Sequence, residues 1–141
     1  MGAIGAPAEL LPEFGKVMDC VQICAARAGQ AALAWGLGAL SAWRATNCAE
    51  MQNRAEIVRA AFCRLPGWEL QSLGAYFAYV RHPFGKTSAW KVAERLASEQ
   101  GLLCLPGPAF AGEDAHLRIA FANVDVAGIA EMEERLRAAS D

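Results

Sequence analysis

Apolar residues recur at helical spacing through the first half of the chain, and this spacing predicts three helices, over residues 7–19, 25–37 and 41–65. The third helix is the longest, and its apolar positions advance alternately by four and three residues: Met51, Ala55, Val58, Phe62 and Leu65. Residues at this spacing lie along one side of a helix, so that side is expected to be buried. Pro66 and Gly67 then end the helix, because proline cannot continue it and glycine is favoured just beyond a C-terminus.

The pattern changes after Gly67. Segments rich in aromatic and aliphatic residues predict four strands, over residues 68–71, 75–82, 102–105 and 116–121. A helix over residues 88–100 separates the second strand from the third, and a last helix begins after Asp125. This order predicts an α+β fold, in which a small mixed β-sheet is covered on one face by helices and is preceded by a long-helix segment.

The helix over residues 88–100 carries terminal signals at both of its ends. Thr87 or Ser88 can cap its first turn through a hydroxyl oxygen, and Gly101 stands where a left-handed residue ends a helix. These signals place the helix between residue 88 and residue 100.

The composition argues against a nucleic-acid partner. Charged residues make up 20% of the 141 residues and the net charge is −2, whereas a nucleic-acid-binding domain normally shows a basic surface. Hydrophobic residues make up 55% of the chain, so some apolar surface is expected to face a subunit partner or another domain. A homodimer is the simplest way to cover such a surface.

No segment is typical of a membrane span or a secretory signal. The longest uncharged run lies between Arg27 and Arg44 and has 16 residues, and a span needs roughly 20 apolar residues. The first twelve residues have no basic segment before an apolar one. The expected location is therefore cytoplasmic, without membrane contact.

The five cysteines show no metal-site spacing. Cys20 and Cys24 are four residues apart, but no second pair of ligands follows at the distance that a zinc site needs. We expect free thiols and no metal site.

Arg118 stands out because it lies within an otherwise apolar strand, at residues 116–121. An arginine in such a strand must reach water or an anion. It could be an edge-strand residue that reaches solvent, it could form a structural ion pair, or it could hold a carboxylate through its planar guanidinium group. The residues alone leave these alternatives open.

Three segments in order resemble the small domain of fold-type I aminotransferases of class I/II, which depend on pyridoxal phosphate (PLP): residues 73–79, 101–112 and 116–121. The second segment is similar to the family's loop G-(apolar)-P-G-x-x-F-G, with Ala111 where the family often has glycine. The third is similar to the family's strand (H)-L-R-(apolar)-(small)-(F). Residues 2–7 also resemble the strand and turn that follow the family's cofactor lysine, so the resemblance covers nearly the whole chain.

The resemblance implies a function as well as a fold. The family transfers an amino group from an amino acid to PLP and then to a 2-oxo acid, with PLP as the electron sink. Carried over to this chain, Arg118 would bind the substrate α-carboxylate, and Pro106, Gly107 and Phe110 would belong to a loop near the substrate. Residues 1–40 would be the end of the large domain with connecting helices, and residues 41–141 the C-terminal small domain.

The family's Schiff-base lysine has no match in this sequence. The lysines are Lys16, Lys86 and Lys91, and none stands at the corresponding position. We therefore expect a truncated aminotransferase fragment that has no catalytic or cofactor-binding residue of its own, binds no PLP and is inactive alone. A non-catalytic module that binds carboxylates, or one that only associates with itself, is the alternative.

Overall fold

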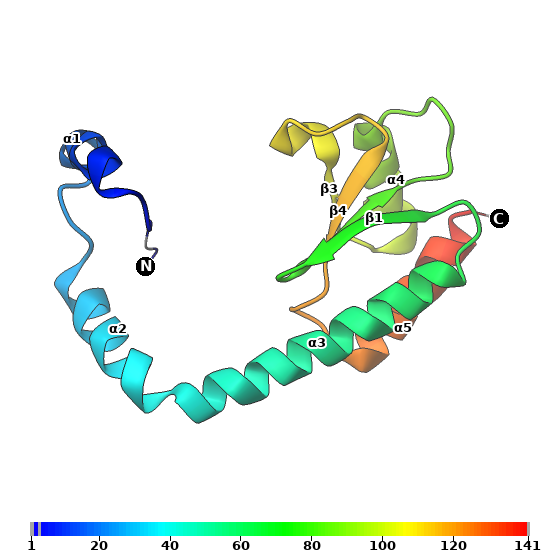
Figure 1. The fold of residues 1–141 in the computed structure, drawn as a ribbon. Helices are drawn as coiled ribbons and strands as arrows, with labels where there is room; N and C mark the ends of the chain where they lie inside the picture. The colour runs from blue at the N-terminus through cyan, green and yellow to red at the C-terminus, as the bar shows by residue number, and fades with distance from the viewer. Residues whose placement is uncertain (1, 3, 141) are drawn as a thin grey trace. The chain divides into compact units, whose positions relative to one another are not determined.

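The computed structural model describes residue 2 and residues 4–140, and the chain divides into two compact units, Met1–Thr46 and Asn47–Asp141. Figure 1 shows the elements of both units along the chain. Because the units are separate, each is described by itself.

The first unit is helical, as the apolar spacing predicts. It contains a short 3-10 helix η1, the helices α1 and α2, and the start of the long helix α3: Ala8–Leu10, Leu11–Val21, Arg27–Ala39 and Ser41–Cys63. Pro12 lies in the first turn of α1, where its missing N–H would have no partner within the helix. Residues 2 and 4–6 form no strand, and Met1 and Ala3 lie outside the described residues.

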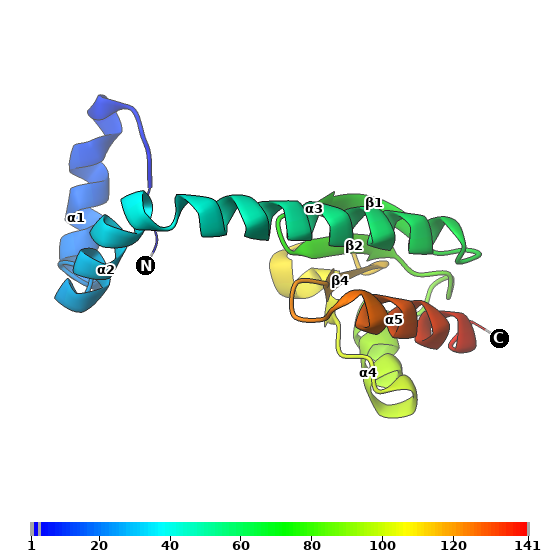
Figure 2. The same cartoon turned by 90° about the horizontal axis from the view of Figure 1, so that it is seen from below.

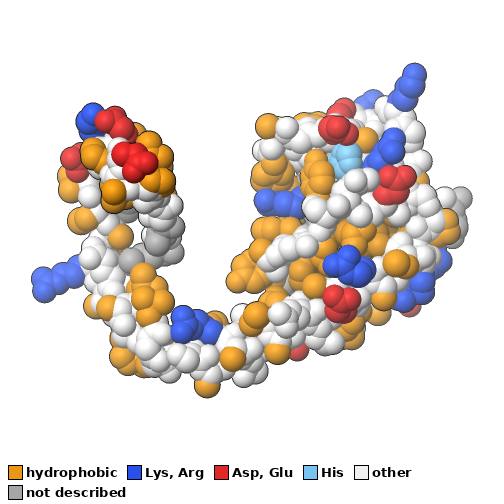
Figure 3. Space-filling view, viewed as in Figure 1, with side chains coloured by type: hydrophobic (Ala, Val, Ile, Leu, Met, Phe, Trp, Pro, Cys, Tyr) orange, Lys and Arg blue, Asp and Glu red, His pale blue; other side chains and the backbone are white. Residues whose placement is uncertain are grey.

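Side chains of the first unit contribute nothing to a core. No residue of η1, α1 or α2 is buried. Most large apolar side chains on these helices, on their connections and at the start of α3 are exposed: Leu10, Leu11, Phe14, Val17, Met18, Val21, Ile23, Leu33, Trp35, Leu37 and Trp43. Apolar side chains are correspondingly visible on the surface of α1 and α2 (Figure 3).

The second unit follows the predicted order of strands and helices. Its elements are β1 Glu69–Gly74, β2 Phe77–Arg81, α4 Ala89–Gln100, β3 Leu105–Pro106, η2 Gly107–Phe110, β4 His116–Ala120 and α5 Val126–Ala138. The Ser88 hydroxyl accepts the Trp90 N–H at the start of α4, and Gly101 ends that helix with φ +61°. The third strand starts at Leu105 rather than at residue 102, because only Leu105 and Pro106 pair with β4.

The sheet has four strands in the order β1-β2-β4-β3, and every neighbouring pair is antiparallel. The α+β class with helices on one face is confirmed, but the sheet is antiparallel rather than mixed. Strands β2 and β3, which α4 connects, run parallel to each other, and β4 lies between them. A parallel pair therefore never forms. Both outer strands are irregular: the register of β1 shifts between Leu70 and Ser72, and β3 has two residues.

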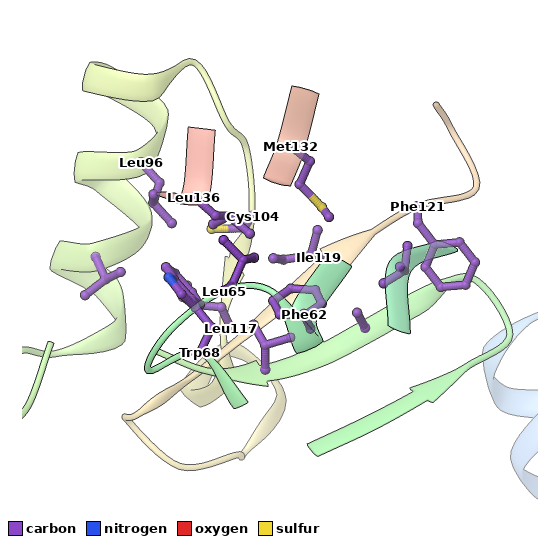
Figure 4. Packing of buried hydrophobic residues seen from close by; sticks show 14 of the residues in the cluster. Phe62, Leu65, Trp68, Leu96, Cys104, Leu117, Ile119, Phe121, Met132 and Leu136 are labelled. Carbon is purple, nitrogen blue, oxygen red and sulfur yellow. The ribbon is translucent and has the colours of Figure 1, made fainter. Parts of the chain in front are cut away.

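The core lies between one face of the sheet and the helices α3, α4 and α5 (Figure 4). Its largest fully buried side chains come from all of these elements: Phe121, Leu96, Leu117, Ile129, Leu136, Val58, Val80 and Val92. Helices α3 and α5 run side by side (Figure 2), and Arg64, directly after α3, donates hydrogen bonds of 3.0 and 2.5 Å to Glu133 of α5. All three α-helices thus cover the same face. The opposite face, which we call the helix-free face, carries no α-helix of the described part of this unit, although the 3-10 helix η2 brings Phe110 to it.

One side chain ties α3 to the connection between β4 and α5. Arg54 is mostly buried and donates hydrogen bonds to the carbonyl oxygens of Ala122 at 2.9 Å and Val124 at 2.6 Å. An arginine so placed satisfies backbone acceptors that no other hydrogen bond of the described residues reaches, so it fixes the path of the chain after β4.

The thiols differ in exposure. Cys20, Cys24, Cys48 and Cys63 are exposed, and Cys104 is buried. Burial raises the pKa of Cys104 to about 11, so this thiol is protonated at neutral pH. None of the helices in the described residues is long and apolar enough to cross a lipid bilayer.

Candidate functional site

Arg118 lies in the middle of the helix-free face of the sheet. On β4 its neighbours Leu117 and Ile119 point into the core, so the alternation of a strand directs Arg118 to the opposite face. It stands opposite Tyr79 on β2 and opposite Leu105 on β3. Since β4 has a strand on each side, Arg118 is not an edge-strand residue.

Two aromatic rings contact the guanidinium group of Arg118. Its Cζ atom lies over the ring of Phe77 at 4.2 Å and over the ring of Phe110 at 3.7 Å from the ring centres. Among the described residues, no Asp or Glu oxygen lies within 4.0 Å of the guanidinium nitrogens of Arg118. These nitrogens donate no hydrogen bond to a described residue. The described residues therefore form no structural ion pair with Arg118, which was one of the alternatives that the sequence left open.

The loop that carries Phe110 is fixed by its backbone. Pro106 is buried and pairs with Leu117 in the ladder between β3 and β4. Gly107 begins η2, and the N–H of Gly112 donates to its carbonyl oxygen at 3.0 Å, which closes the loop. Ala111 adopts φ +58°, a left-handed conformation that explains why glycine is common at this place in the resembling family.

Tyr79 explains the two glycines of this loop, and the sequence did not single it out. A Cβ atom on Gly107 would lie 2.8 Å from the Tyr79 hydroxyl oxygen and 2.6 Å from the Glu113 carbonyl oxygen, and one on Gly112 would overlap the same hydroxyl. Only glycine leaves room for this ring end. Tyr79 stacks on His116 on its other side, with ring centres 4.9 Å apart and planes at 5°. The loop therefore packs against β2 as well as against the strands β3 and β4 that it connects.

The structure brings the predicted site residues together around one side chain. Phe110 contacts Arg118, and Pro106 pairs next to it in the same ladder. Gly107 seats the loop against Tyr79, the residue opposite Arg118. Phe77 is a member of this cluster that sequence reasoning missed, since it is one of several apolar residues in its strand.

The lysines do not lie in this cluster. Lys91 is on α4, which covers the core face of the sheet, while Arg118 is on the other face. Lys16 pairs with Glu13 on α1 in the other unit, and Lys86 lies in the turn before α4. The described contacts of Arg118 thus include no amine to which PLP could be linked.

Comparison with known proteins found no family profile that matches the chain. Among curated proteins, the aromatic aminotransferase ISS1 of Arabidopsis thaliana is 29% identical over 128 residues, which are 90% of this chain and 31% of that protein. The α-aminoadipate aminotransferase LysN of Thermus thermophilus has a similar structure, with a TM-score of 0.77 and 24% identity over 95% of this chain. A PLP-dependent aminotransferase of Streptococcus suis gives a TM-score of 0.74 and 16% identity over 96% of this chain.

The chain spans about a third of these relatives: 31% of the curated protein and 36% of each of the two solved structures. The match covers both units, with the sheet and its helices included. The resemblance drawn from the sequence is confirmed, and the chain has the fold of the C-terminal part, small domain included, of a PLP-dependent aminotransferase.

Proposed function

We propose that the chain is the C-terminal domain of an enzyme that transfers an amino group between an amino acid and a 2-oxo acid with PLP. The observation that carries this proposal is Arg118, whose guanidinium donors no described residue uses, on the helix-free face of an aminotransferase-like fold. The similarity to an aromatic aminotransferase over 90% of the chain supports the same assignment.

In this proposal residues 1–40 are the end of the large domain with connecting helices, and residues 41–141 are the small domain. The absence of buried side chains on η1, α1 and α2 supports the first part, because helices that belong to a larger domain leave their apolar residues uncovered when seen alone. The self-contained core of residues 58–136 supports the second.

Arg118 is proposed to bind the α-carboxylate of the substrate. A guanidinium group presents N–H donors that match both oxygens of a carboxylate, and a bidentate pair also fixes the orientation of the ligand. Pro106, Gly107 and Phe110 form the loop beside it and would border the substrate.

PLP belongs to the full-length enzyme in this proposal, and the 141-residue chain alone is inactive. The reaction needs a lysine amine at the cofactor, and Lys91, on α4, lies on the core side of the sheet rather than beside Arg118. A homodimer and a cytoplasmic location are part of the same proposal. The exposed apolar side chains of residues 10–43 support self-association.

A titration of the ¹⁵N-labelled chain with pyruvate, a small 2-oxo acid, tests the role of Arg118. We expect the side-chain Nε–H signal of Arg118 to shift and saturate. The variant Arg118→Gln should bind roughly tenfold or more weakly, because a hydrogen bond to a charged group contributes about 1.5–3 kcal/mol.

Arg81→Gln is the matched control, because Arg81 lies on β2 of the same sheet, is exposed and sits 3.6 Å from Glu69. Equal affinity of the Arg118→Gln variant would exclude carboxylate binding at this residue. Turnover of L-phenylalanine and 2-oxoglutarate by the pure chain with PLP would contradict its inactivity. Pyruvate binding that depends on Arg118, without transamination when the chain is joined to an aminotransferase large domain, would favour the non-catalytic carboxylate-binding module.

A further inference from the structure

The guanidinium group of Arg118 lies over two rings that come from different elements. Phe77 belongs to β2 and Phe110 to η2, and their ring centres lie 4.2 and 3.7 Å from Cζ of Arg118. A cation is attracted to an aromatic ring when it lies over the ring within about 6 Å of its centre, so both rings interact with the group. We call Phe77 and Phe110 the aromatic clamp.

The two arms of the clamp are placed by the ladder and by the loop. Phe77 is two residues before Tyr79, the partner of Arg118 in the register, and such diagonal neighbours reach each other when their side chains are long. Phe110 is held by η2, whose start at Gly107 is packed under the Tyr79 hydroxyl. The strand β2 therefore positions the ring of Phe77, and the loop at η2 positions the ring of Phe110.

Contact with ring faces leaves the hydrogen-bond donors of the guanidinium group available. All five N–H bonds lie in the plane of the group, whereas a cation over an aromatic ring interacts through the face of that plane. Cζ of Arg118 lies over both rings, and no described residue accepts a hydrogen bond from its nitrogens. The clamp can thus fix the cation while its donors stay free for a ligand.

Arg95 shows the other arrangement in the same unit. Its Cζ lies 4.1 Å from the ring centre of Phe84, a single ring, and its guanidinium donates to the Ala139 carbonyl oxygen at 3.1 Å. Glu99 also lies 4.0 Å from its Nε. The donors of Arg95 are used within the fold, whereas those of Arg118 are not used by any described residue.

We infer that Phe77 and Phe110 are positioning residues that preorganise Arg118 for a carboxylate ligand, an inference that rests on the proposed function of Arg118. An arginine side chain that is free to rotate loses conformational entropy when it binds, and a clamped one loses less. The rings also attract the cation without neutralising it, so the full charge remains for the carboxylate.

The experiment compares leucine and aromatic replacements in the ¹⁵N-labelled 141-residue chain, titrated with pyruvate. Phe77→Leu and Phe110→Leu keep apolar bulk but remove the ring face, and each should weaken binding about two- to fivefold. Phe77→Tyr and Phe110→Tyr keep the ring and should bind within about twofold of the unaltered chain. Phe84→Leu, which removes the ring under Arg95, is the control and should leave pyruvate affinity unchanged.

A second readout is the ring-current shift of the Arg118 side-chain protons without ligand. In the unaltered chain they should resonate upfield of those of an exposed arginine, and each leucine variant should remove part of that shift. A variant that has merely lost stability would lower the unfolding midpoint and would leave the shift of the folded molecules in place.

The outcomes separate the inference from the proposed function. Pyruvate binding that needs Arg118 but is as strong in both leucine variants would overturn the clamp and leave the carboxylate site standing. No binding by the unaltered chain would overturn the carboxylate site and, with it, the role of the clamp. Ring-current shifts that do not respond to either leucine replacement would overturn the clamp by themselves.

Discussion

The two units of the chain both contain amphipathic helices, yet their apolar side chains have different surroundings. In the first unit, residues such as Phe14 and Trp35 are exposed, at 39% and 65%. In the second, Phe121 and Leu117 are exposed by at most 1%. Helical spacing alone therefore creates an apolar face but not a core, because a core also needs a second layer, which here is the sheet.

The largest difference between the units should appear on truncation of a phenylalanine. Phe121→Ala should lower the free energy of unfolding by about 3–5 kcal/mol, because it leaves a cavity in a packed core. Phe14→Ala on α1 should change it by about 1 kcal/mol or less, since this side chain is largely solvated. Urea unfolding followed by the amide signals of β2 and β4 measures both. Equal losses would mean that α1 is packed against another copy in solution, which light scattering would detect.

A smaller difference should appear between two glycines. Gly112→Ala should lower the unfolding free energy by about 1–3 kcal/mol, because the new methyl group overlaps the Tyr79 hydroxyl. Gly15→Ala on α1 meets nothing within 4 Å and should be neutral or stabilising by up to about 1 kcal/mol. Thermal unfolding by circular dichroism compares them.

Adding Tyr79→Phe to the Gly112→Ala variant is the control for this pair, because it removes the oxygen that the methyl group overlaps. Recovery of most of the lost stability is expected. A double variant no more stable than Gly112→Ala would show that the backbone of the loop, and not the hydroxyl, causes the loss.

The smallest difference should come from two glutamates. Hydrogen bonds from Arg64 and then Arg137 lower the pKa of Glu133, whose side chain is 14% exposed. Its stabilisation is therefore present above the usual glutamate pKa of about 4.3 and is lost as the pH falls through the lower folded value. Glu133→Gln should cost about 1 kcal/mol or less at pH 7 and nothing at low pH, as unfolding midpoints at pH 7 and pH 3 would show. In the first unit, Glu13 pairs with Lys16 at 2.6 Å and both side chains are largely exposed, so Glu13→Gln should have no measurable effect on the unfolding midpoint at either pH. A loss of stability in Glu133→Gln that is larger at pH 3 than at pH 7 would contradict the expected pH dependence.

Much of the fold could be predicted because its signals are local. The Ser88 cap, the left-handed Gly101 and the apolar stripe of α3 each depend on residues a few positions apart. The antiparallel sheet could not be predicted in this way, because the insertion of β4 between β2 and β3 is a pairing over long sequence separations. The shift of the third strand to Leu105 likewise depends on which residue of a uniformly apolar segment meets β4.

The candidate site could be predicted only as far as its chemistry is unusual. An arginine in an apolar strand is conspicuous in a sequence, so Arg118 was found, and the family-like loop around Pro106 was found with it. Phe77 and Tyr79 are ordinary strand residues, and their roles arise from the register with β4 and from the space that Gly107 and Gly112 leave. Contacts of this kind become visible only once the strands are paired.

The irregular outer strands of the sheet have a consequence for how the second unit behaves at high concentration. An open sheet edge can recruit a strand from another chain and start aggregation. Here one edge offers only Leu105 and Pro106, of which proline has no N–H to donate, and the other edge is broken by the register shift after Leu70. The fold thus carries its own protection against ordered assembly through its edges, whatever covers its helix-free face.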